Sequence, residues 1–160
     1  MSVFNTHPPK INQKHLIGWL KKNYSFLDNK LISLKLLNSE RDKNFLLFTD
    51  LKKKYVLKLS NSKEKKDLLN LQDYVLRKLS FRPSINKFIP KKIHSSIKSY
   101  EDIGGNICFV RILSYIEGEM YASVKQDLKL EKSLGNLLGN LSNELQNLMK
   151  PAALRKFQWD

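Results

Sequence analysis

The chain has 160 residues, enough to bury one sizeable core, and 41% of them are hydrophobic, which argues against a disordered protein. Lysine and arginine number 29 against 15 aspartate and glutamate, so the net charge is +14. One cysteine, Cys108, excludes an internal disulfide and a cysteine-based metal site, and it fits a reducing compartment.

The positive charge favours binding to phosphate, nucleic acid or an anionic surface. Its lysines are scattered through every segment, however, and no single face or tail collects them. The clusters at residues 52–54 and 63–66 fall on a predicted hairpin tip and a predicted helix start, where charge runs are usually just solvated. We therefore do not favour nucleic acid as a partner, although a basic nucleic-acid-binding module stays an alternative.

No window approaches 18 consecutive apolar residues, and the polar N-terminus lacks the apolar run of a signal peptide. We expect no membrane span and a cytoplasmic protein. The first periodic segment, residues 12–24, predicts a helix that places Leu16, Trp19 and Leu20 on one face, with Asn12 as its N-cap.

Short apolar runs at residues 31–37, 45–48 and 55–59 predict three consecutive antiparallel strands. Alternation along the third run places Lys58 on one face with Val56, and Leu57 on the other. From spacing alone Lys58 is either a solvated lysine of a hairpin or a functional ammonium group. The turn at residues 38–44 is rich in residues that bond their own backbone, which favours a loop that binds phosphate through its N–H groups. It contains no glycine, which argues against that interpretation, and an ordinary surface turn stays an alternative.

A stripe of apolar residues predicts a helix over residues 62–79, capped by Asn61 or Ser62, with Gln72 at the edge of its buried face. The stripe consists of Leu68, Leu71, Val75 and Leu79. Residues 88–94 and 107–115 predict two more strands, which gives a five-stranded sheet with one helix packed across it. From residue 128 to 149 the apolar residues follow the period of a long helix. The last ten residues form a basic amphipathic segment that contains Phe157 and Trp159 and has no visible partner surface. The sequence looks like a chain cut before its second half.

This order of elements resembles the small lobe of a kinase-like phosphotransferase. Five segments are similar in wording and order to the aminoglycoside phosphotransferase family, and most similar to its hydroxylysine kinase branch. They are L-N-S-E-R-D-K-N-F, Y-V-L-K-L-S-N, L-N-L-Q, V-R-I-L-S-Y-I-E-G and P-A-A-L-R-K-F-Q-W-D. The resemblance implies an α+β fold with a nucleotide-binding lobe at residues 1–113, a hinge at 114–118 and the start of a helical lobe at 119–160.

The resemblance also implies roles for matching residues. Lys58 is expected to pair with the phosphates of ATP or GTP, for which its flexible point charge is suited. The loop over those phosphates is expected to include Ser39, Arg41, Asp42 and Asn44. The hinge, which holds the adenine, is expected to include Ser114, Tyr115 and Ile116. The residue that fixes the lysine in many kinases is acidic, but that position falls here on Gln72, with Glu64 as an alternative carboxylate.

A second departure is the catalytic loop. Phosphoryl transfer in this family requires His-x-Asp, an Asn about five residues on, and a following Asp for Mg²⁺. The histidines are His7, His15 and His94, and none stands in such a setting, nor do Asp127 and Asp160. We therefore expect no catalytic or metal-binding residue in this chain, and Mg²⁺ only with the missing lobe.

Two interpretations follow. The first is the N-terminal part of a phosphotransferase that transfers phosphate to a small hydroxyl-bearing acceptor, inactive by itself. The second is a binding module, either a stand-alone nucleotide-binding lobe or the basic nucleic-acid binder named above.

Overall fold

The structure is a computed structural model that describes residues 6–146, 148 and 150–154. The chain divides into two compact units. The first comprises Met1–Lys66 and Lys92–Tyr115, and the second comprises Asp67–Lys91 and Ile116–Asp160.

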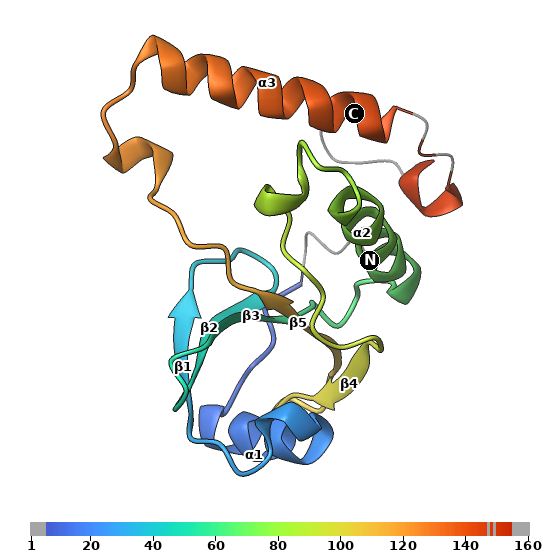
Figure 1. The fold of residues 1–160 in the computed structure, drawn as a ribbon. Coiled ribbons are helices and arrows are strands. Elements are labelled where there is room, and N and C mark those ends of the chain that lie inside the picture. The colour runs from blue at the N-terminus through green and yellow to red at the C-terminus, as the bar shows by residue number, and fades with distance from the viewer. Residues whose placement is uncertain (1–5, 147, 149, 155–160) are drawn as a thin grey trace. The chain divides into compact units, whose positions relative to one another are not determined.

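In the described residues, the first unit holds a five-stranded antiparallel sheet and one α-helix (Figure 1). The strands are β1 (Ile32–Leu37), β2 (Lys43–Thr49), β3 (Lys54–Leu59), β4 (Lys98–Glu101) and β5 (Ile107–Ser114), in the order β1-β2-β3-β5-β4. All neighbouring strands run antiparallel. The predicted α+β class and five-stranded sheet are therefore confirmed.

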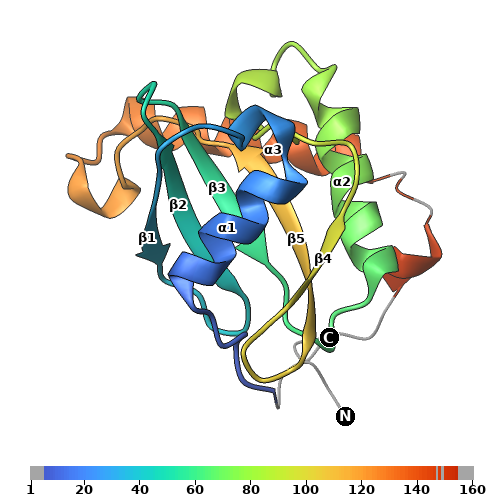
Figure 2. The same ribbon diagram turned by 90° about the horizontal axis from the view of Figure 1, so that it is seen from below.

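Helix α1 (Gln13–Asn23) lies across one face of this sheet, as Figure 2 shows. The Asn12 side chain accepts a hydrogen bond from the His15 amide, so the predicted N-cap is confirmed. Leu16 and Leu20 are fully buried and share one core with apolar side chains from the facing strands. The strand members of that core are Phe45, Leu47, Leu57, Leu59, Tyr100, Val110 and Ile112. Burial of this apolar surface is what fixes which face of each strand points inward.

The predicted strand at residues 88–94 is wrong. This stretch contains a short 3-10 helix, Asn86–Phe88, and a single bridge between Lys92 and Leu113, while the fourth strand lies further on as β4. Pro90 explains the error, because a proline cannot donate to a strand ladder and restricts the residue before it. Tyr100, which is 1% exposed, supplies the apolar anchor that places β4 in the sheet.

The second unit contains helices α2 (Lys66–Ser80) and α3 (Leu128–Leu145). The Lys78 ammonium group donates to the Glu144 carbonyl at 2.9 Å, and Arg82 forms an ion pair with the Glu144 carboxylate at 2.8 Å. These contacts join α3 to α2 and to the turn that follows α2. Asp127 caps α3 by accepting from the Leu130 amide at 2.8 Å.

Helix α2 begins four residues later than the predicted start at residue 62, and Asn61 is not its cap. Of the predicted stripe only Leu79 is buried, and Leu69 is buried in place of its neighbours. The predicted end of the last helix at Met149, and the terminal residues Phe157 and Trp159, lie outside the described residues. The remaining short helices are Ser25–Leu27, Tyr121–Ser123 and Pro151–Leu154. In the described part of the chain no helix is long and apolar enough to cross a membrane.

A buried carboxylate, Asp102, fastens the N-terminal segment to the turn between β4 and β5. One of its oxygens accepts from the Lys10 amide at 3.0 Å, and the Lys10 carbonyl accepts from the Ile103 amide at 3.1 Å. The other oxygen accepts from the Gly104 and Asn106 amides, both at 2.9 Å. Gly105 follows with φ of +75°, a conformation that favours glycine. The turn is thus built around one charged acceptor.

We expect the contribution of Asp102 to stability to depend on pH. Burial raises the pKa of this carboxyl, but the hydrogen bonds from Asn106, Lys10 and Gly104 outweigh burial and leave the pKa below 3.8. The unfolded chain therefore takes up this proton at a higher pH than the folded chain does. The carboxylate stabilises the fold above about pH 4, and this stabilisation is lost as the pH falls through the folded pKa.

Urea unfolding checks this prediction. Asp102→Asn should lower the free energy of unfolding by about 1–3 kcal/mol near neutral pH, because the amide keeps one acceptor oxygen and at least one backbone donor, such as the Lys10 amide, then faces its NH2 group. The difference from the natural protein should shrink as the pH falls below about 4 and through the folded pKa. A difference that stays constant over this range would show that the carboxylate charge does not hold the turn.

Candidate functional site

Lys58 lies in a row of side chains that crosses four strands. It pairs with Asn44 of β2 on one side and with Arg111 of β5 on the other, and Asn44 pairs in turn with Leu37 of β1. Residues paired in an antiparallel ladder point to the same face of the sheet. Leu57 is fully buried in the core under α1, so this row occupies the opposite face.

The Lys58 ammonium group is half-buried, and the Asp42 carboxylate is the negative charge that acts on it. Burial lowers the pKa of Lys58, the Asp42 carboxylate counteracts this, and the Arg111 guanidinium lowers the pKa further. A bound anion stabilises a partly buried ammonium group strongly, because the anion replaces the interactions with water that burial removed. The electrostatics of the row thus favour an anionic ligand.

Two other polar groups in this row are buried. The Asn44 Oδ1 atom is inaccessible and has no hydrogen-bond partner among the described residues, which carries a desolvation cost. Arg111 is only 4% exposed. Sequence reasoning missed Arg111, although a charged residue in the apolar run around it is the same signal that drew attention to Lys58. Together with Lys58, Arg111 gives the row two cations side by side.

The loop between β1 and β2 holds three of the predicted site residues. The Ser39 hydroxyl donates to the Asp42 carbonyl at 2.8 Å, so the loop is closed by a bond between its own side chain and backbone. The Asp42 carboxylate accepts from the Asn61 amide at 2.9 Å, and the Arg41 carbonyl accepts from the Asn61 side chain at 3.4 Å. The structure therefore brings Ser39, Arg41 and Asp42 together in one loop at the end of β2 that carries Asn44.

The predicted hinge residues straddle the boundary between the two units. Ser114 ends β5 opposite Tyr55, and Tyr115 ends the second segment of the first unit. Ile116 begins the second segment of the second unit. Along the paired strands, Ser114 lies about 10 Å from the level of Lys58 and Arg111. The Lys54 ammonium group lies 5.3 Å from the centre of the Tyr115 ring. The hinge role itself stays a prediction.

Gln72, the predicted partner of Lys58, belongs to α2 in the second unit and its side chain is exposed. A contact between these two residues stays a prediction. Glu64, the alternative carboxylate, lies before α2 in the first unit, and its side chain accepts from the Lys65 amide at 3.0 Å.

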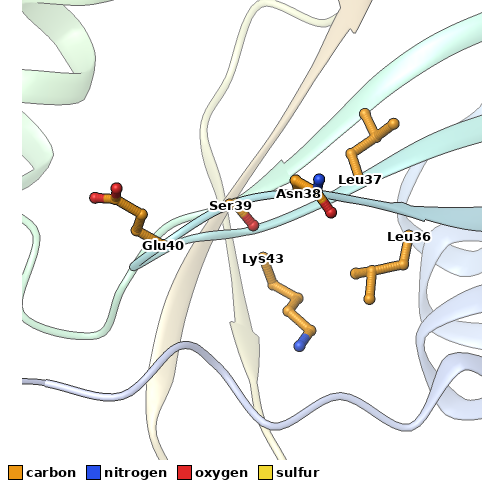
Figure 3. Close-up of a pocket in the computed structure, with 6 residues that line it drawn as sticks. All are labelled: Leu36, Leu37, Asn38, Ser39, Glu40 and Lys43. Atoms are coloured by element: carbon orange, nitrogen blue, oxygen red, sulfur yellow. The ribbon is translucent and has the colours of Figure 1, made fainter.

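A hollow of about 460 Å³ opens at the tip of the β1–β2 hairpin (Figure 3). Its lining residues are Leu36, Leu37, Asn38, Ser39, Glu40 and Lys43. In Figure 3 Leu36 and Lys43 extend to one side of the hairpin and Leu37 to the other, as strand alternation requires. Lys58 does not line this hollow, but Leu37, the β1 member of the row, and Ser39 of the loop do.

The described residues contain no group of three or more His, Cys, Asp or Glu side chains that could hold a metal ion.

Comparison with known proteins gives the fold. The chain matches a solved structure described as that of a microcompartment-associated aminopropanol kinase, with a TM-score of 0.67 and 18% sequence identity. The match covers 93% of this chain and 45% of that kinase, so the chain spans less than half of its length. No protein-family model and no curated protein matches. This protein therefore has a kinase-like α+β fold.

Proposed function

We propose that this chain is the N-terminal, nucleotide-binding part of an ATP- or GTP-dependent small-molecule phosphotransferase. Within the kinase-like fold it is of the aminoglycoside phosphotransferase type, nearest to the hydroxylysine kinase branch. One observation carries the proposal: the Lys58 ammonium group stands half-buried beside Asn44 and Arg111, on the sheet face opposite the core. The likeness in fold to a kinase supports it.

In this proposal Lys58 binds the phosphates of the nucleotide. A lysine on a strand offers a point charge at a fixed place, and phosphoryl transfer depends on positioning and on stabilising charge. The loop that contains Ser39 and Asp42 lies over those phosphates. Its backbone groups supplement the lysine.

The base of the nucleotide lies further along the same strands. Val56 and Leu113 are paired neighbours on the face that carries Lys58, one step towards Ser114. Their apolar side chains suit the flat face of a purine, and the backbone of Ser114, Tyr115 and Ile116 supplies hydrogen bonds to its edge. This arrangement places the base and the phosphates at opposite ends of β3.

The acceptor is a small molecule with a hydroxyl group, and hydroxylysine is the best single candidate. The sequence has no His-x-Asp motif with a following Asn, so this chain lacks the base that takes up the hydroxyl proton. We propose that the catalytic loop, the Mg²⁺ ligands and the acceptor site lie in a further segment of a longer cytoplasmic protein.

Lys58→Ala tests the phosphate role. The 160-residue chain should bind ATP weakly, because one wall of the cleft is missing, and Lys58→Ala should lower this affinity about tenfold or more. Titration calorimetry measures the effect. Lys53→Ala removes the same charge from the exposed turn between β2 and β3 and should leave the affinity nearly unchanged. Equal losses of ATP affinity in the two variants would show that only the net charge of the chain matters, and would contradict a specific role for Lys58.

Catalysis gives a second test. The purified 160-residue chain should transfer no phosphate from ATP to hydroxylysine, ethanolamine or aminopropanol, because positioning and metal-assisted charge stabilisation are incomplete. Radiolabelled transfer assays measure this, with Lys58→Ala as the background. Transfer above that background by the chain alone would overturn the assignment of the catalytic residues to another segment.

A further inference from the structure

Asn61 is fully buried and joins two segments that are far apart in the sequence. One is the N-terminal strap, residues 6–10. The Thr6 hydroxyl donates to the Asn61 Oδ1 atom at 2.8 Å, and the Asn61 Nδ2 atom donates to the His7 carbonyl at 3.1 Å. At its other end the strap is fastened by the bond from the Lys10 amide to Asp102. The strap is therefore held at both ends, and Asn61 holds the end nearer the N-terminus.

The second segment is the β1–β2 loop, residues 38–42. The Asn61 Nδ2 atom also donates to the Arg41 carbonyl at 3.4 Å. The backbone N–H of Asn61 donates to the Asp42 carboxylate at 2.9 Å. The same carboxylate is the anion that favours the charged form of Lys58. The backbone N–H of Asn61 thus holds the carboxylate whose charge acts on Lys58.

The orientation of the Asn61 amide follows from its partners. The Oδ1 atom accepts from the Lys63 amide at 2.9 Å, and a backbone amide can only donate. The Nδ2 atom donates to two carbonyl oxygens, which can only accept. A turned side chain would place an oxygen against two carbonyls. One side chain in one orientation therefore serves the strap and the loop together.

We propose that Asn61 is a positioning residue that couples the N-terminal strap to the β1–β2 loop, so that the attachment of the strap sets how firmly the loop holds the phosphates of a nucleotide. The phosphate part of this inference rests on the proposed function.

The physical reason is the shared amide. Freeing the strap removes the donor from Thr6 and the acceptor at His7, so the Asn61 side chain is no longer held from that side. The Arg41 carbonyl then loses a fixed donor, and the loop, which keeps the bond from the Asn61 backbone N–H to Asp42, samples more conformations. A phosphate that needs one loop conformation binds less tightly, because its apparent affinity scales with the population of that conformation.

Thr6→Val tests the coupling without touching the loop. Valine keeps the shape of threonine and removes the hydroxyl donor, whereas Thr6→Ser keeps a hydroxyl. Hydrogen exchange of the backbone amides at residues 38–44 is measured without ligand, and the affinity for inorganic tripolyphosphate is measured by calorimetry. We expect exchange in the loop to rise about threefold to tenfold in Thr6→Val and the affinity to fall by a similar factor, with Thr6→Ser close to the natural protein.

Asn61→Asp is the stronger variant, because a carboxylate keeps the acceptor and loses both donated bonds. It should raise loop exchange further than Thr6→Val does. Asn12→Asp is its matched control, since aspartate caps a helix as well as asparagine and the charge change is the same. This control should leave loop exchange and affinity unchanged.

Unchanged loop exchange in Thr6→Val would overturn the coupling, even if the melting temperature fell. Thr6→Val and Thr6→Ser decide this also where Asn61→Asp fails to fold. If the natural protein binds neither tripolyphosphate nor ATP, the proposed function fails, and the exchange measurement still decides whether the strap controls the loop.

Discussion

The structure depends on the alternation of side chains along β3. Leu57 and Leu59 are fully buried in the core beneath α1, which forces Lys58 to the opposite face. The same alternation in the neighbouring strands places Asn44 and Arg111 beside it. A half-buried cation on a sheet is costly unless it meets an anion, so the packing of the core and the proposed chemistry follow from a single strand register.

Sequence periodicity predicted the parts of the fold that core packing determines. The buried faces of α1 and β3 follow from the spacing of their apolar residues, and no proline or distant contact disturbs that spacing. The strand predicted at residues 88–94 is wrong because the prediction gave more weight to apolar composition than to Pro90, whose ring prevents regular strand pairing. The predicted start of α2 is wrong because Asn61 looks like a helix cap in sequence. Its side-chain amide instead bonds to the distant residues Thr6 and His7, which no local pattern reveals.

The candidate site was predictable only in part. Lys58 stands out in sequence as a charge inside an apolar run, and Arg111 carries the same signal. The neighbours of Lys58 are set by strand pairing, which the sequence of β3 alone does not reveal. The position of the Asp42 carboxylate depends on a hydrogen bond from the backbone N–H of Asn61, which is distant in sequence. The fold is kinase-like, and at 18% identity the chemistry has to be argued from these groups rather than from the likeness in fold.

Amide chemical-shift mapping during a tripolyphosphate titration tests the central claim most directly, that a defined anion site lies at Lys58. The account predicts saturable shifts concentrated at Asp42, Asn44, Lys58 and Arg111, and their loss in Lys58→Ala. Shifts that do not saturate and that spread over scattered exposed lysines, such as those at residues 52–53, would contradict the claim. They would show only the general attraction of a chain with a net charge of +14 for anions.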